Sequence, residues 1–113
     1  MDIDNLTIKD IKQIQGLLPS ANSGTKKPSP FKVGENYLIR TVTMITVGKL
    51  EEVYDTELVL SSASWIADTG RFHDALKSGS LSEVEPFVDN IVVGRGAIID
   101  ATTWRHSLEM KQK

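Results

Sequence analysis

The chain has 113 residues, of which 40% are hydrophobic and 25% are charged, and its formal net charge at pH 7 is −2. This length and composition are ordinary for one globular domain with a modest core. The absence of cysteine excludes a disulfide framework, a thiolate zinc site and a cysteine nucleophile.

The charges are unevenly distributed along the chain. From Tyr37 to Arg105 there are ten acidic residues, two lysines and four arginines, whereas seven of the nine lysines lie outside this segment. Such a segment is a poor binder of long nucleic acid, which requires cationic side chains along one face. The sequence holds no apolar run near the about 20 residues that span a bilayer, and its acidic start lacks a signal-peptide core. We therefore expect a cytoplasmic protein that binds neither long nucleic acid nor a membrane.

The N-terminal part is expected to be an arm followed by a linker. Ile8, Ile11 and Leu18 recur at helical spacing, and Pro19 ends the pattern, so residues 1–18 are predicted to form a helical arm. A helix this short is marginal alone, so it must dock on the domain or on a partner. Residues 19–32 are rich in proline and serine and predict a linker; the alternative is a frayed tail.

Residues 33–113 are expected to form the main domain, which begins with strands. The segment NYLIRTVTMITVGKLEEVYD (36–55) predicts one long strand or two, bent at Gly48. A tight turn is expected at residues 55–56, and ELVLSSASWI (57–66) predicts a returning strand. Leu58 and Leu60 share one face of that strand, and Val59 takes the other.

The second half of the domain is expected to hold a helix and more strand. RFHDALKSG (71–79) predicts a short helix with an apolar stripe from Phe72 to Leu76 and a stop at Gly79. A loop through Pro86 leads to NIVVGRGAIIDATTW (90–104), which predicts a strand or a hairpin interrupted at residues 94–96. The fold class is therefore α+β: a small antiparallel sheet with one short internal helix, plus a separate N-terminal helix on its linker.

The familiar catalytic and cofactor patterns are missing. The Gly-Arg-Gly stretch at 94–96 is not a dinucleotide fingerprint, because Ile99 stands where a third glycine is needed. It predicts a β-bulge or tight bend, or else a place where a ligand approaches the backbone beside Arg95. His73 and His106 show no metal-ligand spacing, and the pair Glu83 and Glu85 is typical of a solvated strand face. We therefore predict no enzyme, no cofactor and no metal.

The two tryptophans stand near arginines in the sequence. Trp65 is followed by Arg71 and Phe72, and Trp104 directly precedes Arg105. Guanidinium groups match phosphate oxygens, and flat aromatic faces stack on nucleobases. The pattern therefore favours a site for a small nucleotide, although the tryptophans could instead belong to the core or to a subunit interface.

From about residue 36 to residue 105 the chain resembles small phage and prophage proteins of an uncharacterised domain family, and is similar to the phage Thoeris anti-defence sponges. The resemblance rests on YLIRTVT, VGKL, ELVLSSASWIADTGRF, EVEPF and VGRGAIIDATTWR. It implies a non-enzymatic homo-oligomer, hexameric in that family, that sequesters a cyclic ADP-ribose isomer or a cyclic oligonucleotide.

Under this hypothesis aromatic rings stack on the ligand, arginines hold its phosphates, and Asp100 or Asn90 bonds a ribose or base edge. The expected ligand-binding residues are Arg40, Trp65, Arg71, Phe72, Phe87, Asn90, Arg95, Asp100, Trp104 and Arg105. An alternative function is a structural or interaction module of a phage or prophage that oligomerises and recruits a protein partner through its N-terminal helix. A nucleotide-degrading enzyme ranks behind both.

Overall fold

A computed structural model of the protein describes residues 29–113. The predicted N-terminal arm (1–18) and most of the predicted linker (19–32) lie outside the described residues. Residues Phe31–Lys113 form one compact unit. No helix within the described part of the chain is long and apolar enough to cross a membrane.

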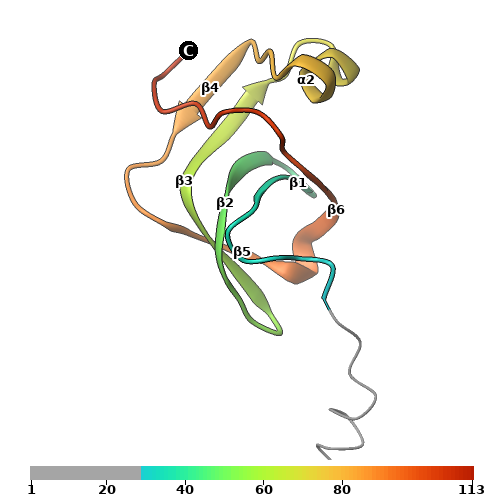
Figure 1. The fold of residues 1–113 in the computed structure, drawn as a ribbon, viewed down its shortest axis with the longest axis vertical. Helices are drawn as coiled ribbons and strands as arrows, with labels where there is room; N and C mark the ends of the chain where they lie inside the picture. The colour runs from blue at the N-terminus through green and yellow to red at the C-terminus, as the bar shows by residue number, and fades with distance from the viewer. Residues whose placement is uncertain (1–28) are drawn as a thin grey trace, which may run out of the picture. The chain divides into compact units, whose positions relative to one another are not determined.

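The unit is an antiparallel sheet of six strands with one α-helix, as the α+β prediction requires, and most of it is sheet (Figure 1). Its elements in chain order are β1 (Asn36–Thr41), β2 (Ile45–Val53), β3 (Glu57–Asp68), α2 (Phe72–Ser78), β4 (Glu83–Pro86), β5 (Ile91–Gly94), the 3₁₀ turn η1 (Arg95–Ala97) and β6 (Ile98–Thr103).

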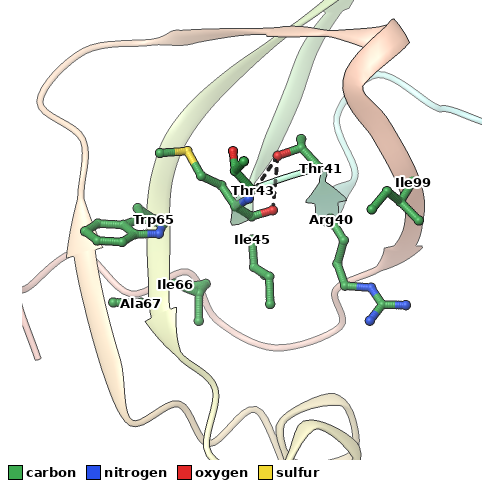
Figure 2. Close-up of a pocket in the computed structure, with 9 residues that line it drawn as sticks. Arg40, Thr41, Thr43, Ile45, Trp65, Ile66, Ala67 and Ile99 are labelled. Carbon is green, nitrogen blue, oxygen red and sulfur yellow. Dashed lines mark hydrogen bonds between the residues drawn. The ribbon is translucent and has the colours of Figure 1, made fainter.

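The first two strands are separated by a turn at residues 42–44. The Thr41 hydroxyl accepts a hydrogen bond from the Met44 N–H at 3.1 Å and donates one to the Met44 carbonyl at 3.2 Å (Figure 2). The Thr41 N–H also donates to that carbonyl, at 2.8 Å. These bonds close the turn although its residues favour strand. Of the two predicted alternatives, one long strand or two, the structure has two, and the break lies upstream of Gly48.

Gly48 lies inside β2, where the pairing of β2 with β3 shifts register between Val47 and Lys49. A Cβ at this position would lie 2.9 Å from the Cβ of Ala63. The glycine is therefore needed because β3 approaches closely, and the strand bends here without ending.

The predicted hairpin between β2 and β3 is confirmed. The Tyr54 N–H donates to the Glu57 carbonyl at 2.8 Å, which closes the turn at residues 55–56. Leu58 and Leu60 are fully buried, and Val59 between them is half-buried. Alternation along the strand thus places the two leucines on the core face, as expected.

β3 is long enough to pair with two further strands besides β2. Its first part pairs with β5, with Leu58 opposite Val93, and its last part pairs with β4, with Ile66 opposite Val84. At the other edge β6 pairs with β1. η1 joins β5 directly to β6 along the chain, but within the described sheet these two strands pair with β3 and β1 and not with each other.

Two expectations for this region are wrong. The hairpin option for residues 90–104 fails because β5 and β6 pair with different strands, β3 and β1, and η1 turns the chain from one to the other. The loop expected through Pro86 is strand β4 over Glu83–Pro86. Pro86 is its last residue, where a missing N–H costs the ladder little.

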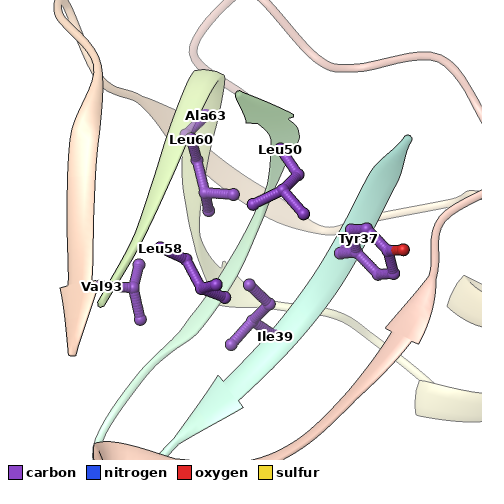
Figure 3. Close-up of a cluster of buried hydrophobic side chains, with 7 residues drawn as sticks. All are labelled: Tyr37, Ile39, Leu50, Leu58, Leu60, Ala63 and Val93. Carbon is purple, nitrogen blue, oxygen red and sulfur yellow. The ribbon is translucent and has the colours of Figure 1, made fainter. Parts of the chain in front are cut away.

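Two clusters of buried side chains fill the two faces of the sheet. The first lies on the inner face of the curved sheet, where side chains from β1, β2, β3 and β5 converge (Figure 3). Its members are Tyr37, Ile39, Leu50, Leu58, Leu60, Ala63 and Val93. The second lies on the outer face under α2, and its members are Leu38, Val47, Ile66, Ala75, Leu81, Val84 and Trp104.

The predicted helix at 71–79 is confirmed as α2. Ala75 is buried, and Phe72 and Leu76 pack against the outer-face cluster. Gly79 ends the helix with φ +78°, and its N–H donates to the Ala75 carbonyl at 2.8 Å. This left-handed conformation suits glycine, which lacks a Cβ.

The segment after β6 runs back across the outer face to β4 (Figure 1). Val84 and Lys113 exchange backbone hydrogen bonds of 2.9 and 3.1 Å, and the Ser64 hydroxyl donates to the Glu109 carbonyl at 3.0 Å. Leu108 packs against the outer-face cluster. The C-terminal segment therefore belongs to the folded unit.

Candidate functional site

A pocket of about 410 Å³ lies between the β1–β2 turn, the last part of β3 and the start of β6. Trp65 and Arg40 stand on opposite sides of it, with Ile45 and Ile66 between them (Figure 2). We call it the Arg40–Trp65 pocket, and it is lined by Arg40, Thr41, Thr43, Met44, Ile45, Trp65, Ile66, Ala67 and Ile99.

Arg40 is held by an ion pair with Asp100 across the β1–β6 ladder. The two residues are direct cross-strand partners. The Arg40 Nε donates to one carboxylate oxygen at 2.7 Å, and Nη2 donates to the other. These two bonds lower the pKa of the Asp100 carboxyl and raise that of the Arg40 guanidinium. Both side chains remain exposed to solvent, at 41% for Arg40 and 48% for Asp100, so the pair mainly fixes the direction of the guanidinium.

Phe72 holds the same guanidinium from a second side. The Arg40 Cζ lies 4.8 Å from the centre of the Phe72 ring, a cation–π contact. Phe72 is the first residue of α2 and packs against the outer-face cluster, so its ring is anchored to the core. Arg40 is therefore orientated by β6 and by the helix before any ligand arrives.

Trp65 presents an aromatic face to solvent although it lies within β3. Its cross-strand neighbours are Thr46 on β2 and Glu85 on β4. Strand alternation places its neighbours Ser64 and Ile66 on the opposite, buried face. Trp65 is 39% exposed, which leaves part of its apolar surface open to solvent.

A second pocket, of about 500 Å³, lies beside the first. It shares Thr41 and Met44 with the Arg40–Trp65 pocket and is otherwise lined mostly by apolar side chains. We call it the Phe87 pocket, and its lining residues are Thr41, Met44, Thr46, Phe87, Ile91, Val92, Val93, Gly94 and Ala97.

The structure gathers four of the expected ligand-binding residues around one pocket. Arg40 and Trp65 line it, while Asp100 and Phe72 hold Arg40 in place. Phe87 lines the adjoining pocket and is 38% exposed.

The other expected residues lie elsewhere. Trp104 is a core residue, 3% exposed, whose indole N–H donates to the Ser107 carbonyl at 3.2 Å. Arg95 donates to the Tyr54 carbonyl at 2.8 Å. The remaining three are exposed and line neither pocket: Arg71, Asn90 and Arg105. Adjacency of tryptophan and arginine in the sequence thus did not identify the pocket.

Sequence reasoning missed the contribution of the β1–β2 turn. Thr43 and Met44 line the Arg40–Trp65 pocket from this turn, but TVTMIT was interpreted as continuous strand. The available signal was the local pairing of Thr41 with residue 44, since threonine hydroxyls often close short turns. Ile99 also lines the pocket, but the sequence pattern marked it only as the residue that replaces the third glycine of a dinucleotide fingerprint.

The pocket combines one cation, threonine hydroxyls and an indole. These groups can hold an anion, hydrogen-bond to hydroxyls and stack on a flat ring. Among residues 29–113 no group of three or more acidic or histidine side chains is placed to hold a metal ion. The arrangement is suited to binding a small polar ligand that carries a ring.

Comparisons with protein-family models, with curated proteins and with solved structures found no match to this chain. The similarity to phage sponge proteins therefore stays a prediction from the sequence.

Proposed function

We propose that the protein binds a small nucleotide in the Arg40–Trp65 pocket and holds it without chemical change. In the terms of the sequence resemblance, the ligand is a cyclic nucleotide immune signal, a cyclic ADP-ribose isomer or a cyclic oligonucleotide. The protein would act as a homo-oligomeric anti-defence sponge in the cytoplasm of an infected or lysogenic bacterium. One observation carries the proposal: an orientated arginine and an exposed tryptophan line the same pocket.

The size and chemistry of the pocket support a nucleotide. Its volume of about 410 Å³ lies within the range of small-molecule sites, about 300–1,000 Å³. The indole of Trp65 can stack on a base, the Thr43 hydroxyl can hydrogen-bond to a sugar, and Arg40 can hold a phosphate.

Arg40 retains donors for a phosphate despite its ion pair. A guanidinium has about five N–H donors, and Asp100 engages Nε and one N–H of Nη2. The remaining donors, on Nη1 and Nη2, are left for another acceptor. Arg40 would therefore bridge Asp100 and the ligand, while the Asp100 charge limits affinity for anions.

The proposal of binding without catalysis is supported by the lining itself. None of the side chains that line the pocket is a histidine, aspartate or glutamate, and the one carboxylate at its edge, Asp100, is engaged by Arg40. A sponge also needs only to retain its ligand. Heat denaturation of a loaded sample should release the nucleotide unchanged, and recovery of a hydrolysed product would instead indicate an enzyme.

Calorimetric titration of the full chain tests the proposal. The ligands are cyclic ADP-ribose isomers and cyclic di- and trinucleotides, and the variant is Trp65→Ala beside a Tyr54→Ala control. Tyr54 is also exposed but lines neither pocket. We expect heat with at least one ligand, a loss of about 5- to 100-fold in affinity for Trp65→Ala, and no change for the control. Absence of heat with every ligand would contradict the proposal.

The alternative, an interaction module, is favoured by a different observation. Val42, Val92 and Ile99 are each more than 60% exposed, at 72%, 62% and 65%, beside the two pockets. Deletion of residues 1–20 separates the two functions. Loss of a protein partner with unchanged nucleotide binding would show that both operate, whereas loss of a partner in a chain that binds no nucleotide would favour the module.

A further inference from the structure

We propose that the open edge of β5 is a docking site for a basic peptide, which binds in an extended conformation and adds a strand to the sheet. The site is distinct from the Arg40–Trp65 pocket and takes a different class of partner, so it goes beyond the proposed function. Three features of the β5 edge carry the proposal: the direction of its backbone N–H groups, the apolar pocket against it, and the negative charge beside it.

The first support is that two N–H groups of β5 point away from β3. Within the described part of the chain β5 pairs with β3 alone, in an antiparallel ladder. The Arg95 N–H donates to the Thr56 carbonyl at 2.9 Å, one step beyond the pair of Glu57 and Gly94. Bonded and non-bonded pairs alternate in such a ladder, so the N–H groups of Gly94 and Val92 are directed to the open edge. An incoming strand can accept both of them.

The second support is that the Phe87 pocket lies against this strand. All four residues of β5, Ile91–Gly94, line the pocket, which has a volume of about 500 Å³ and no charged side chain in its lining. A strand added beside β5 would direct every second side chain to the face of the buried Val93. An apolar residue of the peptide can therefore enter the pocket while its neighbours stay on the surface. Pockets for alternate side chains give specificity when a peptide adds a strand to a sheet.

The third support is a carboxylate that the added strand can reach. Glu57 is exposed, and its cross-strand partner is Gly94, which has no side chain. Adjacent strands lie about 4.8 Å apart, so a peptide residue opposite Gly94 would have its backbone about 10 Å from that of Glu57. A lysine or arginine at that point can extend over the glycine to the carboxylate, a path that a large side chain at position 94 would obstruct.

The charge around this edge also favours a cation. Four acidic residues belong to the β2–β3 hairpin: Glu51, Glu52, Asp55 and Glu57. Arg95, the first residue after β5, donates to the Tyr54 carbonyl at 2.8 Å rather than to one of these carboxylates. Complementary charge selects among partners and speeds their association, so the peptide is expected to be basic.

The test begins with selection of a display library of random heptapeptides against the immobilised full chain. The selected consensus peptide is then synthesised, and its affinity is measured by calorimetry. The decisive variant is Gly94→Pro, which removes one outward N–H. Gly94 already has a φ of −70°, which suits proline, and a Cβ there would meet nothing within 4 Å. Gly94→Ala is the matched control because it adds a Cβ and keeps the N–H.

We expect a consensus that alternates apolar residues with residues that include lysine or arginine. Its affinity for Gly94→Pro should be at least about 10-fold weaker than for Gly94→Ala, since a hydrogen bond is lost and the proline ring obstructs the edge. Glu57→Gln should weaken binding about 2- to 5-fold at low salt. Thermal unfolding of each variant shows whether the fold is retained.

A second measurement requires no variant of the protein. Methylating the amide nitrogens at alternate positions of the peptide should abolish binding for one set of positions and spare the other, because alternate N–H groups of a strand face one edge. Equal effects of the two sets would overturn the proposal, as would equal affinity for the two Gly94 variants or a selection that yields no binding peptide. An oligomer that dissociates in Gly94→Pro would place a second copy at this edge and overturn it too. Because Gly94 does not line the Arg40–Trp65 pocket, none of these results bears on nucleotide binding there.

Discussion

Arg40 and Asp100 are 60 residues apart in the sequence, yet they face each other across the β1–β6 ladder and form a two-point ion pair at the edge of the Arg40–Trp65 pocket. The Phe72 ring supports the same guanidinium from the helix side. Three elements, β1, β6 and α2, therefore fix the direction of the one cation that lines the pocket. An arginine orientated in this way loses less conformational entropy when a ligand binds.

Removing the charge of Asp100 should strengthen the binding of anionic ligands. Asp100→Asn keeps the shape of the side chain but removes the carboxylate that competes with a phosphate for Arg40. For an exposed pair we expect affinity to rise about 2- to 5-fold at low salt, measured by calorimetry with the nucleotide that binds best. A fall in affinity would show instead that Asp100 contacts the ligand directly, for example through a ribose hydroxyl.

The ion pair with Arg40 should be detectable as a lowered pKa of the Asp100 carboxyl. The hydrogen bonds from Arg40 lower the pKa of this carboxyl in the folded state. The folded pKa then lies below the unfolded one, so the pair stabilises the fold above the unfolded value of about 3.9. That contribution is lost as the pH falls through the folded pKa.

Carbon-13 NMR of the Asp100 carboxyl measures this pKa directly. Arg40→Gln removes the charge, and the midpoint should then move up toward the ordinary value for aspartate. Identical midpoints in the wild-type chain and in Arg40→Gln would show that the pair does not persist in solution.

The two tryptophans should differ in their roles. Trp104 is 3% exposed inside the outer-face cluster, so Trp104→Ala should lower the free energy of unfolding by about 3–5 kcal/mol. Trp65 is 39% exposed, so Trp65→Ala should cost under about 1 kcal/mol but weaken the ligand. Urea unfolding measures the free energy of unfolding of each variant. A comparable loss of stability in both variants would contradict the assignment of Trp104 to the core and of Trp65 to the ligand site.

Gly79 should tolerate no side chain. Its φ is +78°, and a Cβ there would lie 2.6 Å from the Cγ of His106, whose ring nitrogen bonds the Leu76 carbonyl. We expect Gly79→Ala to lower the free energy of unfolding by about 2–4 kcal/mol, the sum of backbone strain and overpacking. Gly96→Ala is the matched control, since a Cβ there meets nothing within 4 Å, and its unfolding should change by less than about 0.5 kcal/mol.

Elements with strong local signals were predictable from the sequence. Leu58 and Leu60 alternate along β3, and Phe72, Ala75 and Leu76 followed by a glycine mark α2. These patterns are formed by residues that are close together in the sequence, so they can be recognised without knowing the tertiary structure. The antiparallel sheet and the hairpin turn at residues 55–56 follow from the same kind of signal.

The elements that were missed depend on partners far away in the sequence. β4 is a four-residue strand that exists because it pairs with β3 and with Lys113. β5 and β6 look like one interrupted strand, but they pair with β3 and β1. Short β-branched stretches have no intrinsic preference that selects between such partners, so tertiary packing decides.

The pocket was predictable only in part, for a related reason. Residue types suited to nucleotide binding were visible in the sequence, but the sequence did not show which of them line the same pocket. Arg40 and Trp65 line the same pocket because β1, β2 and β3 are adjacent in the sheet, whereas Trp104 is buried in the outer-face cluster after β6. Sequence proximity of Trp104 to Arg105 gave no information about which ring stays exposed.

The most direct test of the central claim is a ¹H–¹⁵N NMR titration of the full chain with cyclic di-AMP and, separately, with a cyclic ADP-ribose isomer. Nucleotide binding between Arg40 and Trp65 predicts saturating shifts of the Trp65 indole and the Arg40 and Thr43 signals, with the buried Trp104 indole unmoved. Spectra that stay unchanged with both ligands, or shifts confined to residues outside the two pockets, would contradict it.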